Sequence, residues 1–372
     1  MAKGNSGPLL KPESETSGSK RPQTKKSKAR EIRKANAPKA SIPIKADAES
    51  SCSTVLLELQ QRCLHVFRDA LHPSGEDAVL LQEVKGHLYN RDFATAFGKE
   101  EYLRVYASRW SPSRALGYVQ IFDDIEEFVL PDEGHDSVGS PDKQPVEIAC
   151  LGGGAGAELV ALGGWLSQVR EREADLKLSV KLVDIASWGP TMAALQRRVE
   201  MTPEPAKYAS TVAKEESQPL LPEGALDMQF QKQDVLEWSE AELAALVGKA
   251  KLVTLMFTLN ELYSTDRPKT QRLLSFLGAA MPSDALLLVV DSPGSYSTVS
   301  INEAEKKYPM QWLLDYTLLG PPQKPDAEPS EKSATWEKVM SEDSKWFRLQ
   351  GLQYPIELEN MRYQIHLYKR LG

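Results

Sequence analysis

The chain has 372 residues, 41% of them hydrophobic and 26% charged, and its formal net charge is −7. No stretch approaches the ~20 apolar residues of a membrane span, and the N-terminus lacks the apolar core of a secretory signal. Cys52, Cys63 and Cys150 form neither a zinc spacing nor a disulfide framework. Composition therefore argues against a membrane protein, a secreted protein and a structural metal site, and the length suggests about two domains.

The N-terminal tail is basic, whereas the rest of the chain is acidic. Residues 1–45 hold 12 Lys and Arg against three acids, a charge of +9, which leaves −16 for the remainder of a chain whose total is −7. Residues 1–50 contain few large apolar side chains, so we predict a disordered basic tail. Its clusters Lys20-Arg21 and Lys25–Arg30 are typical of a nuclear or nucleolar signal and a weak RNA-binding arm. The alternative is a solvated tail without a specific role; we expect the protein in the nucleus, the nucleolus and also the cytoplasm.

Helical periodicity begins near Ser53 and predicts a small helical domain over residues 51–130. A fourth helix is expected to start at Ser111 and Pro112, because serine is a good N-cap and proline suits the first turn. Arg109 and Trp110 would then lie in the loop before it. The three earlier helices are expected from about Val55, over 77–88 and over 99–109.

After a linker at 131–145, residues 146–372 alternate short apolar strands with helices. This order predicts an α/β domain, with a mainly parallel sheet covered by helices on both faces. The expected strands are 146–151, 178–184, 227–230, 251–258 and 285–291, with helices at 157–172, 189–199, 239–247, 268–280 and 301–318. A polar insert is expected at 320–343, followed by a closing antiparallel pair near 345–350 and 361–369.

The most informative segment is the glycine turn after the first of these strands. Gly152, Gly153, Gly154 and Gly156 separate the strand from a helix that begins near Glu158. Glycine lets the backbone approach a ligand closely, and a helix N-terminus presents free N–H groups to an anionic group. The turn therefore predicts a nucleotide-like cofactor. Such turns occur in nicotinamide and S-adenosylmethionine (SAM) proteins, and the spacing fits GxGxG better than GxGxxG.

Three later residues are candidates for contacts with this cofactor. Asp184 ends the second strand, where a carboxylate can accept hydrogen bonds from ribose hydroxyls. Its distance from the glycines exceeds the ~20 residues of the NAD fingerprint, which disfavours NAD. Trp188 could lie on the adenine face or pack in the core. Asp234, after the third strand, could accept a hydrogen bond from the adenine amino group or cap a turn.

Polar residues also follow the fourth and fifth strands, at the sheet edge where ligands of open α/β proteins bind. Asn260 could orient a polar substrate atom, and Glu261 could accept a proton or cap the next segment. Tyr263 offers a stacking face. Asp291 closes the fifth strand and could line the same pocket. This edge is therefore the expected meeting point of substrate and cofactor.

Together, several segments resemble the fungal SAM-dependent 25S ribosomal RNA uridine-N3 methyltransferases of the uridine-2843 type. They are Leu88–Phe93, Ala96–Gly98, Arg109–Leu116, Leu151–Glu158 and Phe257–Leu262. The glycine motif is common to many methyltransferases, whereas RWSPSRAL and FTLNEL are much narrower. The resemblance covers most of the chain beyond the tail. It implies a class I SAM-methyltransferase (Rossmann-like) fold with SAM as cofactor. The implied partner is 25S ribosomal RNA or a pre-60S particle. We expect a monomer that binds neither a metal nor a membrane.

The resemblance also implies methyl transfer to N3 of a uridine. The sulfonium of SAM is already activated, so positioning supplies much of the acceleration. The ring N–H must lose its proton, and Glu261 or Asp291 could assist. No cysteine follows the fourth strand, which argues against a covalent route through the ring.

The helical domain is expected to cover the carboxyl edge of the sheet. Arg109, Trp110 and Arg114 would then face Asn260 and Glu261 across a cleft that admits a flipped base. Arginine and aromatic side chains grip RNA backbone and splayed bases. The alternative is a salt bridge at a domain interface.

Two rival functions remain open at this stage. Cys150 stands where the wider class usually has an acid, which leaves open the group that meets the amino-acid end of SAM. That departure is the best support for an inactive RNA-binding relative of the fold. The second rival is a SAM-dependent protein methyltransferase, against which the basic tail favours RNA.

Overall fold

The computed structural model describes residues 53–130, 144–203, 218–294, 296–301, 304–321 and 335–372. The basic tail, residues 1–50, and most of the linker at 131–145 lie outside the described residues. The disorder, the localisation signal and the RNA-binding arm assigned to the tail therefore stay predictions.

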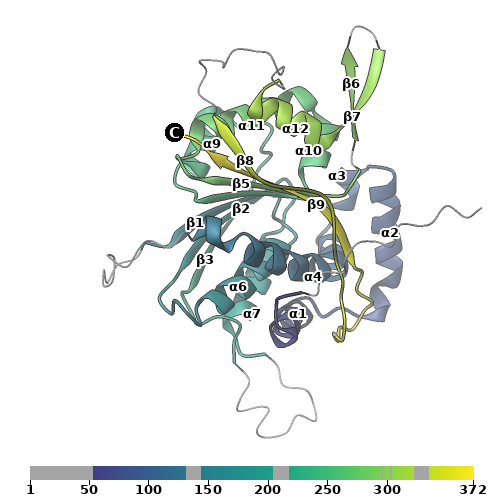
Figure 1. Ribbon diagram of the computed structural model, residues 1–372. Coiled ribbons are helices and arrows are strands. Elements are labelled where there is room, and N and C mark those ends of the chain that lie inside the picture. Colours follow the sequence, from purple (N-terminus) through teal and green to yellow (C-terminus); the bar gives the residue numbers. More distant parts are fainter. Residues whose placement is uncertain (1–52, 131–143, 204–217, 295, 302–303, 322–334) are drawn as a thin grey trace, which may run out of the picture. The chain divides into compact units, whose positions relative to one another are not determined.

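A seven-stranded sheet in the order β3-β2-β1-β4-β5-β9-β8 forms the centre of the fold (Figure 1). The first five strands of this order are parallel, and β9 pairs antiparallel with both β5 and β8. The strands are β1 Val146–Leu151, β2 Leu178–Asp184, β3 Leu226–Lys232, β4 Leu252–Met256, β5 Leu286–Asp291, β8 Trp336–Phe347 and β9 Met361–Arg370. The chain order reverses between β1 and β4, and open α/β proteins bind their ligands at the carboxyl ends of strands at such a reversal.

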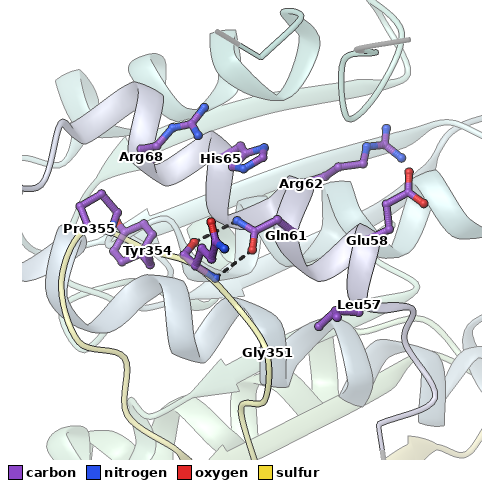
Figure 2. A pocket seen from close by; sticks show the side chains of 10 residues that line it. Leu57, Glu58, Gln61, Arg62, His65, Arg68, Gly351, Tyr354 and Pro355 are labelled. Carbon is purple, nitrogen blue, oxygen red and sulfur yellow. Dashed lines mark hydrogen bonds between the residues drawn. The ribbon is translucent and has the colours of Figure 1, made fainter. Parts of the chain in front are cut away.

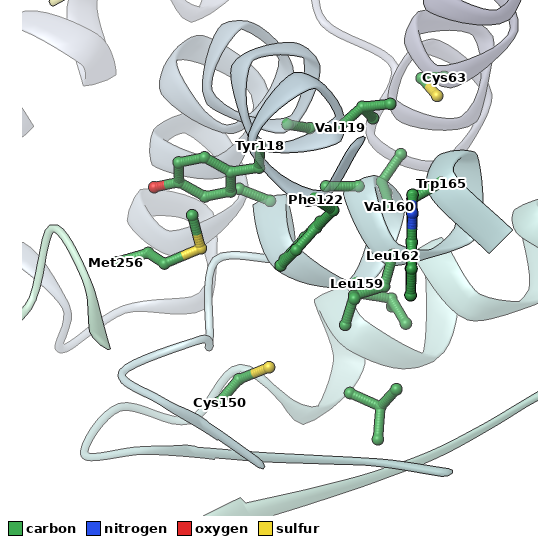
Figure 3. Close-up of a cluster of buried hydrophobic side chains, with 14 of the residues drawn as sticks. Cys63, Tyr118, Val119, Phe122, Cys150, Leu159, Val160, Leu162, Trp165 and Met256 are labelled. Carbon is green, nitrogen blue, oxygen red and sulfur yellow. The ribbon is translucent and has the colours of Figure 1, made fainter. Parts of the chain in front are cut away.

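Helices cover both faces of this sheet. The larger hydrophobic cluster joins the sheet to α1 Leu57–Leu71, α4 Glu100–Asp124, α6 Ala157–Val169 and α7 Gly189–Glu200 (Figures 1 and 3). The cluster on the opposite face involves α9 Glu240–Val247, α10 Leu259–Thr265, α11 Arg267–Ala280 and α12 Met310–Leu319. Alternate residues of β1 enter the two clusters, Ile148 and Cys150 the first, Ala149 and Leu151 the second. The shorter elements are a 3-10 turn Gly75–Asp77, α2 Ala78–Tyr89, α3 Phe93–Ala96, α5 Glu126–Val129, β6 Tyr296–Ile301 and β7 Ala304–Pro309.

The N-terminal helices therefore share one hydrophobic core with the sheet, and residues 50–372 form a single compact unit. The boundary drawn between a helical domain at 51–130 and a methyltransferase domain at 146–372 stays a prediction. Within the described ranges, no helix is long and apolar enough to cross a membrane.

The alternation of strands and helices between residues 146 and 291 is confirmed, but two later expectations are wrong. The helix expected at 301–318 is split: β6 and β7 form a hairpin, and α12 starts at Met310. Residues 304–307 favour a helix by composition, and cross-strand pairing overrides that preference. The polar insert also ends earlier, because β8 begins at Trp336. This edge strand carries many exposed charged residues, so its sequence looks like a loop.

The expected loop at Arg109 and Trp110 is also wrong, because α4 runs unbroken through Pro112. Proline has no backbone N–H, so the carbonyl of Ser108, four residues earlier, loses its donor within the helix. The hydroxyl of Tyr354 donates to this carbonyl at 3.3 Å. The helix can thus continue for two reasons: Tyr354 supplies the missing donor, and α4 is packed against the protein on most of its sides.

Tyr354 belongs to a loop between β8 and β9 that packs against α1. Gln61 of α1 and Gln353 exchange two hydrogen bonds of 2.9 Å, which fix the loop beside the helix (Figure 2). A cavity of about 840 Å³ lies next to this contact, lined by Arg62 and His65 of α1 and by Tyr354 among others. None of its lining residues is a predicted site residue.

We expect Tyr354→Phe to lower the free energy of unfolding by about 1 kcal/mol or more, because the Ser108 carbonyl loses a donor. In a Pro112→Ala background the backbone N–H of residue 112 returns, and Tyr354→Phe should cost clearly less. Urea unfolding of the wild type, both single variants and the double variant measures this coupling. An equal cost in both backgrounds would contradict the explanation.

Candidate active site

The glycine turn after β1 has no room for side chains. Gly152 and Gly156 adopt φ of +85° and +82°, the left-handed region that favours glycine. A Cβ at Gly154 would lie 1.9 Å from Trp188 Cδ1 and 2.6 Å from Asp184 Cγ. The glycines therefore let the backbone of the turn pack directly against these side chains, and Gly153, Gly154 and Gly156 are buried.

The same turn contacts the start of α6 and the end of β4. A Cβ at Gly153 would lie 2.7 Å from Glu158 Oε2, and one at Gly152 would lie 2.3 Å from Thr258 Oγ1. The structure thus gathers Gly152, Gly153, Gly154, Gly156 and Glu158 around one turn, as expected from the sequence. Thr258 was missed by sequence reasoning, although it lies in the FTLNEL segment.

Asp184 lies at the carboxyl end of β2, directly beside the glycine turn. Its Oδ2 accepts a hydrogen bond from the Gly154 N–H at 3.1 Å, and its Oδ1 accepts one from the Ala186 N–H at 2.9 Å. Burial raises the pKa of this carboxyl despite those bonds. A carboxylate has about four acceptor positions, and the Trp188 side chain and the Ile185 N–H also interact with this one. The hydrogen bonds of Asp184 to ribose hydroxyls therefore stay a prediction. Ile185, 61% exposed and missed by sequence reasoning, adds an apolar surface next to it.

Trp188 lies over Gly154 and is almost fully buried. Its ring centroid lies 6.0 Å from that of Phe97 and 5.9 Å from that of Tyr106, whose ring in turn lies 4.7 Å from that of Trp110. Trp188 therefore packs in an aromatic cluster with α4, which was the alternative to an adenine contact. The adenine contact stays a prediction, and among the described ring contacts Trp110 reaches the site through Tyr106.

Glu158 is a buried carboxyl in the first turn of α6, 3% exposed. Thr254 donates a hydrogen bond of 2.5 Å to its Oε1. Burial raises its pKa to about 7, while hydrogen bonds from Thr254 and Cys150 oppose that shift. Glu158 therefore places a carboxyl group beside Cys150 and the glycine turn, and its role as the acid that meets SAM stays a prediction.

Asp291 ends β5 and holds the start of α10. Its Oδ2 accepts a hydrogen bond from the Asn260 N–H at 2.9 Å, and its Oδ1 accepts one from the Ser292 N–H at 2.7 Å. The side chain is buried, and burial raises its pKa. Asp291 thus positions Asn260 at the sheet edge, and its carboxylate is less accessible than a proton acceptor needs.

Arg114 and Glu261 lie near each other at the same edge. The guanidinium of Arg114 lies 4.7 Å from the ring centroid of Phe257 and donates to the Tyr106 hydroxyl at 3.1 Å. Desolvation raises the pKa of Glu261 to about 7; Arg114 opposes this shift and Asp291 reinforces it. The residue nevertheless keeps exposed surface, and contact with water makes the shift smaller than burial alone would give. This combination is typical of a group poised for proton transfer.

Phe257 and Tyr106 were missed by sequence reasoning. Phe257 adopts φ of +59°, an uncommon conformation for a bulky residue that is typically retained at functional sites. Its position in FTLNEL was the available signal. Tyr106 gave no local signal.

Three residues that we expected at the site make structural contacts instead: an ion pair, a packing contact in the core and a turn. Arg109 is 8% exposed, forms an ion pair with Glu359 and donates to the Glu357 carbonyl at 3.0 Å, so the expectation that it faces Glu261 is wrong. Tyr263 is buried in the cluster with α11 and α12 and offers no stacking face. Asp234 Oδ1 accepts from the Leu236 N–H at 2.9 Å, which closes a turn; its contact with adenine stays a prediction.

The parallel sheet with its antiparallel closing pair, the glycine turn and the acid after β2 together define a class I SAM-dependent methyltransferase. The family described as "Putative SAM-dependent methyltransferase" matches residues 67–369, and the chain belongs to this family. The glycine cradle and its flanking carboxylates fit SAM, which carries ribose hydroxyls and positive charge.

The chain is also similar to individual proteins. The chain is 30% identical over 324 residues to the 25S rRNA (uridine(2843)-N(3))-methyltransferase of Saccharomyces cerevisiae, covering 81% of this chain and 82% of that protein. A SAM-dependent methyltransferase structure from Methanosarcina mazei has 9% identity and a TM-score of 0.35, covering 62% of this chain and 94% of the other. One from Clostridium acetobutylicum has 11% identity and a TM-score of 0.33, with coverage of 77% and 100%.

We expect Gly154→Ala to weaken SAM binding roughly tenfold or more, because the added methyl group would displace Trp188 and Asp184, both expected cofactor contacts, and overpacking of this kind costs about 1–3 kcal/mol. Gly189→Ala is the matched control: it adds the same methyl group beside Trp188, where the nearest atom would lie 4.0 Å away. Isothermal titration calorimetry with SAM measures both. Equal affinities, with melting temperatures unchanged, would place the cofactor elsewhere.

We expect Glu158 to make the SAM-free protein less stable as pH rises. Its folded pKa of about 7 exceeds its ordinary value of 4.5, so the folded protein binds the proton of Glu158 more tightly than the unfolded chain does. The resulting contribution to the free energy of unfolding is complete below pH 4.5 and is lost as pH rises through about 7. That difference corresponds to on the order of 3 kcal/mol. Glu158→Gln retains an acceptor for Thr254 but does not ionise, so its stability relative to wild type should increase between pH 5 and pH 8. Parallel pH profiles in urea unfolding would refute this.

Proposed function

We propose that this protein transfers the methyl group of SAM to N3 of a uridine in large-subunit ribosomal RNA. The observation that carries the proposal is the relative from Saccharomyces cerevisiae, which is 30% identical and named for this reaction. The match covers about four fifths of both chains, so it extends far beyond the glycine turn. Family membership supports the methyl transfer independently.

Glu261 is the residue that we assign to proton removal. When bound, SAM supplies a methyl group on an activated sulfonium, but N3 of uracil carries a proton that must leave. A base with a pKa of about 7 accepts protons efficiently near neutral pH, and the side chain stays accessible to substrate. Asp291, whose two oxygens hold backbone N–H groups, positions Asn260 beside this base.

Arg114 is the residue that we assign to charge stabilisation. Loss of the N3 proton leaves negative charge on the uracil ring, and a fixed cation nearby favours that state. The guanidinium is held by the Phe257 ring and the Tyr106 hydroxyl, so it needs little reorganisation. The uridine must leave its stack to reach this edge, and the Phe257 ring offers it an apolar wall.

The direct test is methyl transfer in vitro from SAM labelled in its methyl group, with ribosomal RNA and total ribosomal protein as competing acceptors. Label in RNA that digests to 3-methyluridine supports the proposal. Label in protein, or RNA label in any other nucleoside, contradicts it.

We expect Glu261→Gln to lower the turnover number at pH 7 at least tenfold while SAM affinity is kept, because general-base assistance is typically worth 10²–10⁴-fold. The deficit should shrink as pH rises, since solvent then removes more of the N3 proton. Glu240→Gln, an exposed glutamate on α9, is the control for loss of one negative charge. Full activity of Glu261→Gln, or a deficit that is independent of pH, would remove Glu261 from the mechanism.

A further inference from the structure

An exposed cluster of two arginines and a tryptophan lies where β8 and β9 meet the carboxyl edge of the sheet. We propose that Arg348, Trp346 and Arg362 bind the backbone and a neighbouring base of the single-stranded RNA beside the target uridine. The inference rests on the proposed function, because it names the part of the substrate that this surface would hold. None of the three residues takes part in the site described above.

The cluster is built on paired strands. Trp346 of β8 lies directly opposite Arg362 of β9. The guanidinium of Arg348 lies 4.9 Å from the Trp346 ring centroid, and that of Arg362 lies 5.6 Å from it. Arg362 also donates to Ser344 Oγ at 3.0 Å. These contacts keep two cations beside one indole before any ligand arrives.

Within the described part of the chain, no ion pair neutralises the charges of this cluster. Among the residues that the structure describes, no carboxylate lies within ion-pair distance of Arg348 or Arg362. Arg104 and Arg172, by contrast, pair with Asp77 and Glu126. All three cluster residues are exposed. The chain carries −7 in total and residues 1–45 carry +9, so residues 46–372 carry −16. Two cations without a carboxylate partner make a local positive patch that can bind an anionic group, although the body as a whole is negative.

The position of the cluster connects it to the reaction. Gln364 of β9 is paired with Asp291 at the end of β5, and its side chain donates to the Ser292 carbonyl at 2.8 Å. Arg362 lies two residues before Gln364, beyond the carboxyl end of β5. Figure 1 shows β8 and β9 continuing past the parallel strands on this side, where α4 also lies. RNA that presents a uridine to Glu261 would therefore pass this surface.

Trp346 and Arg362 lie on the face of the β8–β9 pair that points away from α4, which also favours RNA as the ligand. Phe347 and Met361, the next cross-strand pair, are buried, and a Cβ at Gly117 of α4 would lie within 2.2 Å and 3.6 Å of Met361 and Phe347 atoms. Trp346 and Arg362 consequently point away from α4 into solvent. Arginine and tryptophan together suit RNA, because guanidinium groups bind phosphates and planar groups stack on bases.

The test measures RNA binding by the full-length protein, without methyl transfer. A short fluorescent oligouridine is titrated by fluorescence anisotropy at several salt concentrations, with wild type, Trp346→Ala and the double variant Arg348→Ala/Arg362→Ala. The charge-matched control is Arg197→Ala/Lys249→Ala, on α7 and after α9, two exposed positions outside the cluster. SAM affinity and melting temperature show that each variant is folded.

We expect Trp346→Ala and the cluster double variant each to weaken binding about tenfold or more, with SAM affinity unchanged. The salt slope of the double variant should fall by about 1.4, because each single-strand phosphate contact contributes about 0.7. The control double variant should change affinity less than threefold. If the cluster double variant binds RNA as well as the control double variant does, the inference is overturned, and the surface would be left to a protein partner. If the wild type binds RNA through this cluster but methylates no uridine, only the proposed function is overturned.

Discussion

The docking of α4 onto the glycine turn is the contact on which the rest of the site depends. Ser111 Oγ donates to the Ala155 carbonyl at 2.7 Å, which ties the middle of α4 to the cofactor cradle. Arg114 and Tyr118 follow at helical spacing on the same face, one lying over the Phe257 ring and the other 6.4 Å from it. Pro112 lies within this segment, and the helix survives it because Tyr354 satisfies the freed carbonyl. One helix therefore connects the loop after β8, the cofactor turn and the substrate edge.

A second constraint is the concentration of carboxyl groups at one end of the sheet. Burial raises the pKa of Glu158, Asp184, Glu261 and Asp291, and Asp184 raises those of Glu158 and Glu261 further. Such an arrangement costs free energy in the protein alone, because each negative charge disfavours the next. SAM carries a sulfonium and an ammonium group, so SAM bound beside these carboxyl groups, as we propose, would relieve part of this repulsion. Cofactor affinity and protein stability are thus linked through the same side chains.

The sequence predicted what depends on local pattern, and failed where a distant residue decides. The parallel strands, the glycine turn and Asp184 followed from periodicity and spacing, and their arrangement is as expected. Arg109 could not be placed, because its partner Glu359 lies 250 residues away along the chain. The unbroken α4 depends in the same way on Tyr354. Tyr263 lies on the buried face of a short helix, whose orientation only the packing of α11 and α12 determines.

The position of Glu158 bears on whether this chain is an enzyme or an inactive relative of one. Cys150 stands in β1 where the wider class has a carboxylate. A protein that no longer bound the cofactor would not need a second carboxyl group at this place. Glu158 nevertheless lies buried beside Cys150 and Gly153, at a cost that its raised pKa records. A leucine or glutamine there would avoid that cost and fill similar space. The retained charge is explained if it meets the cationic amino-acid end of SAM, and the exposed Glu261 with a pKa near 7 is explained by proton transfer at the same edge. Both carboxyl groups therefore favour an active methyltransferase.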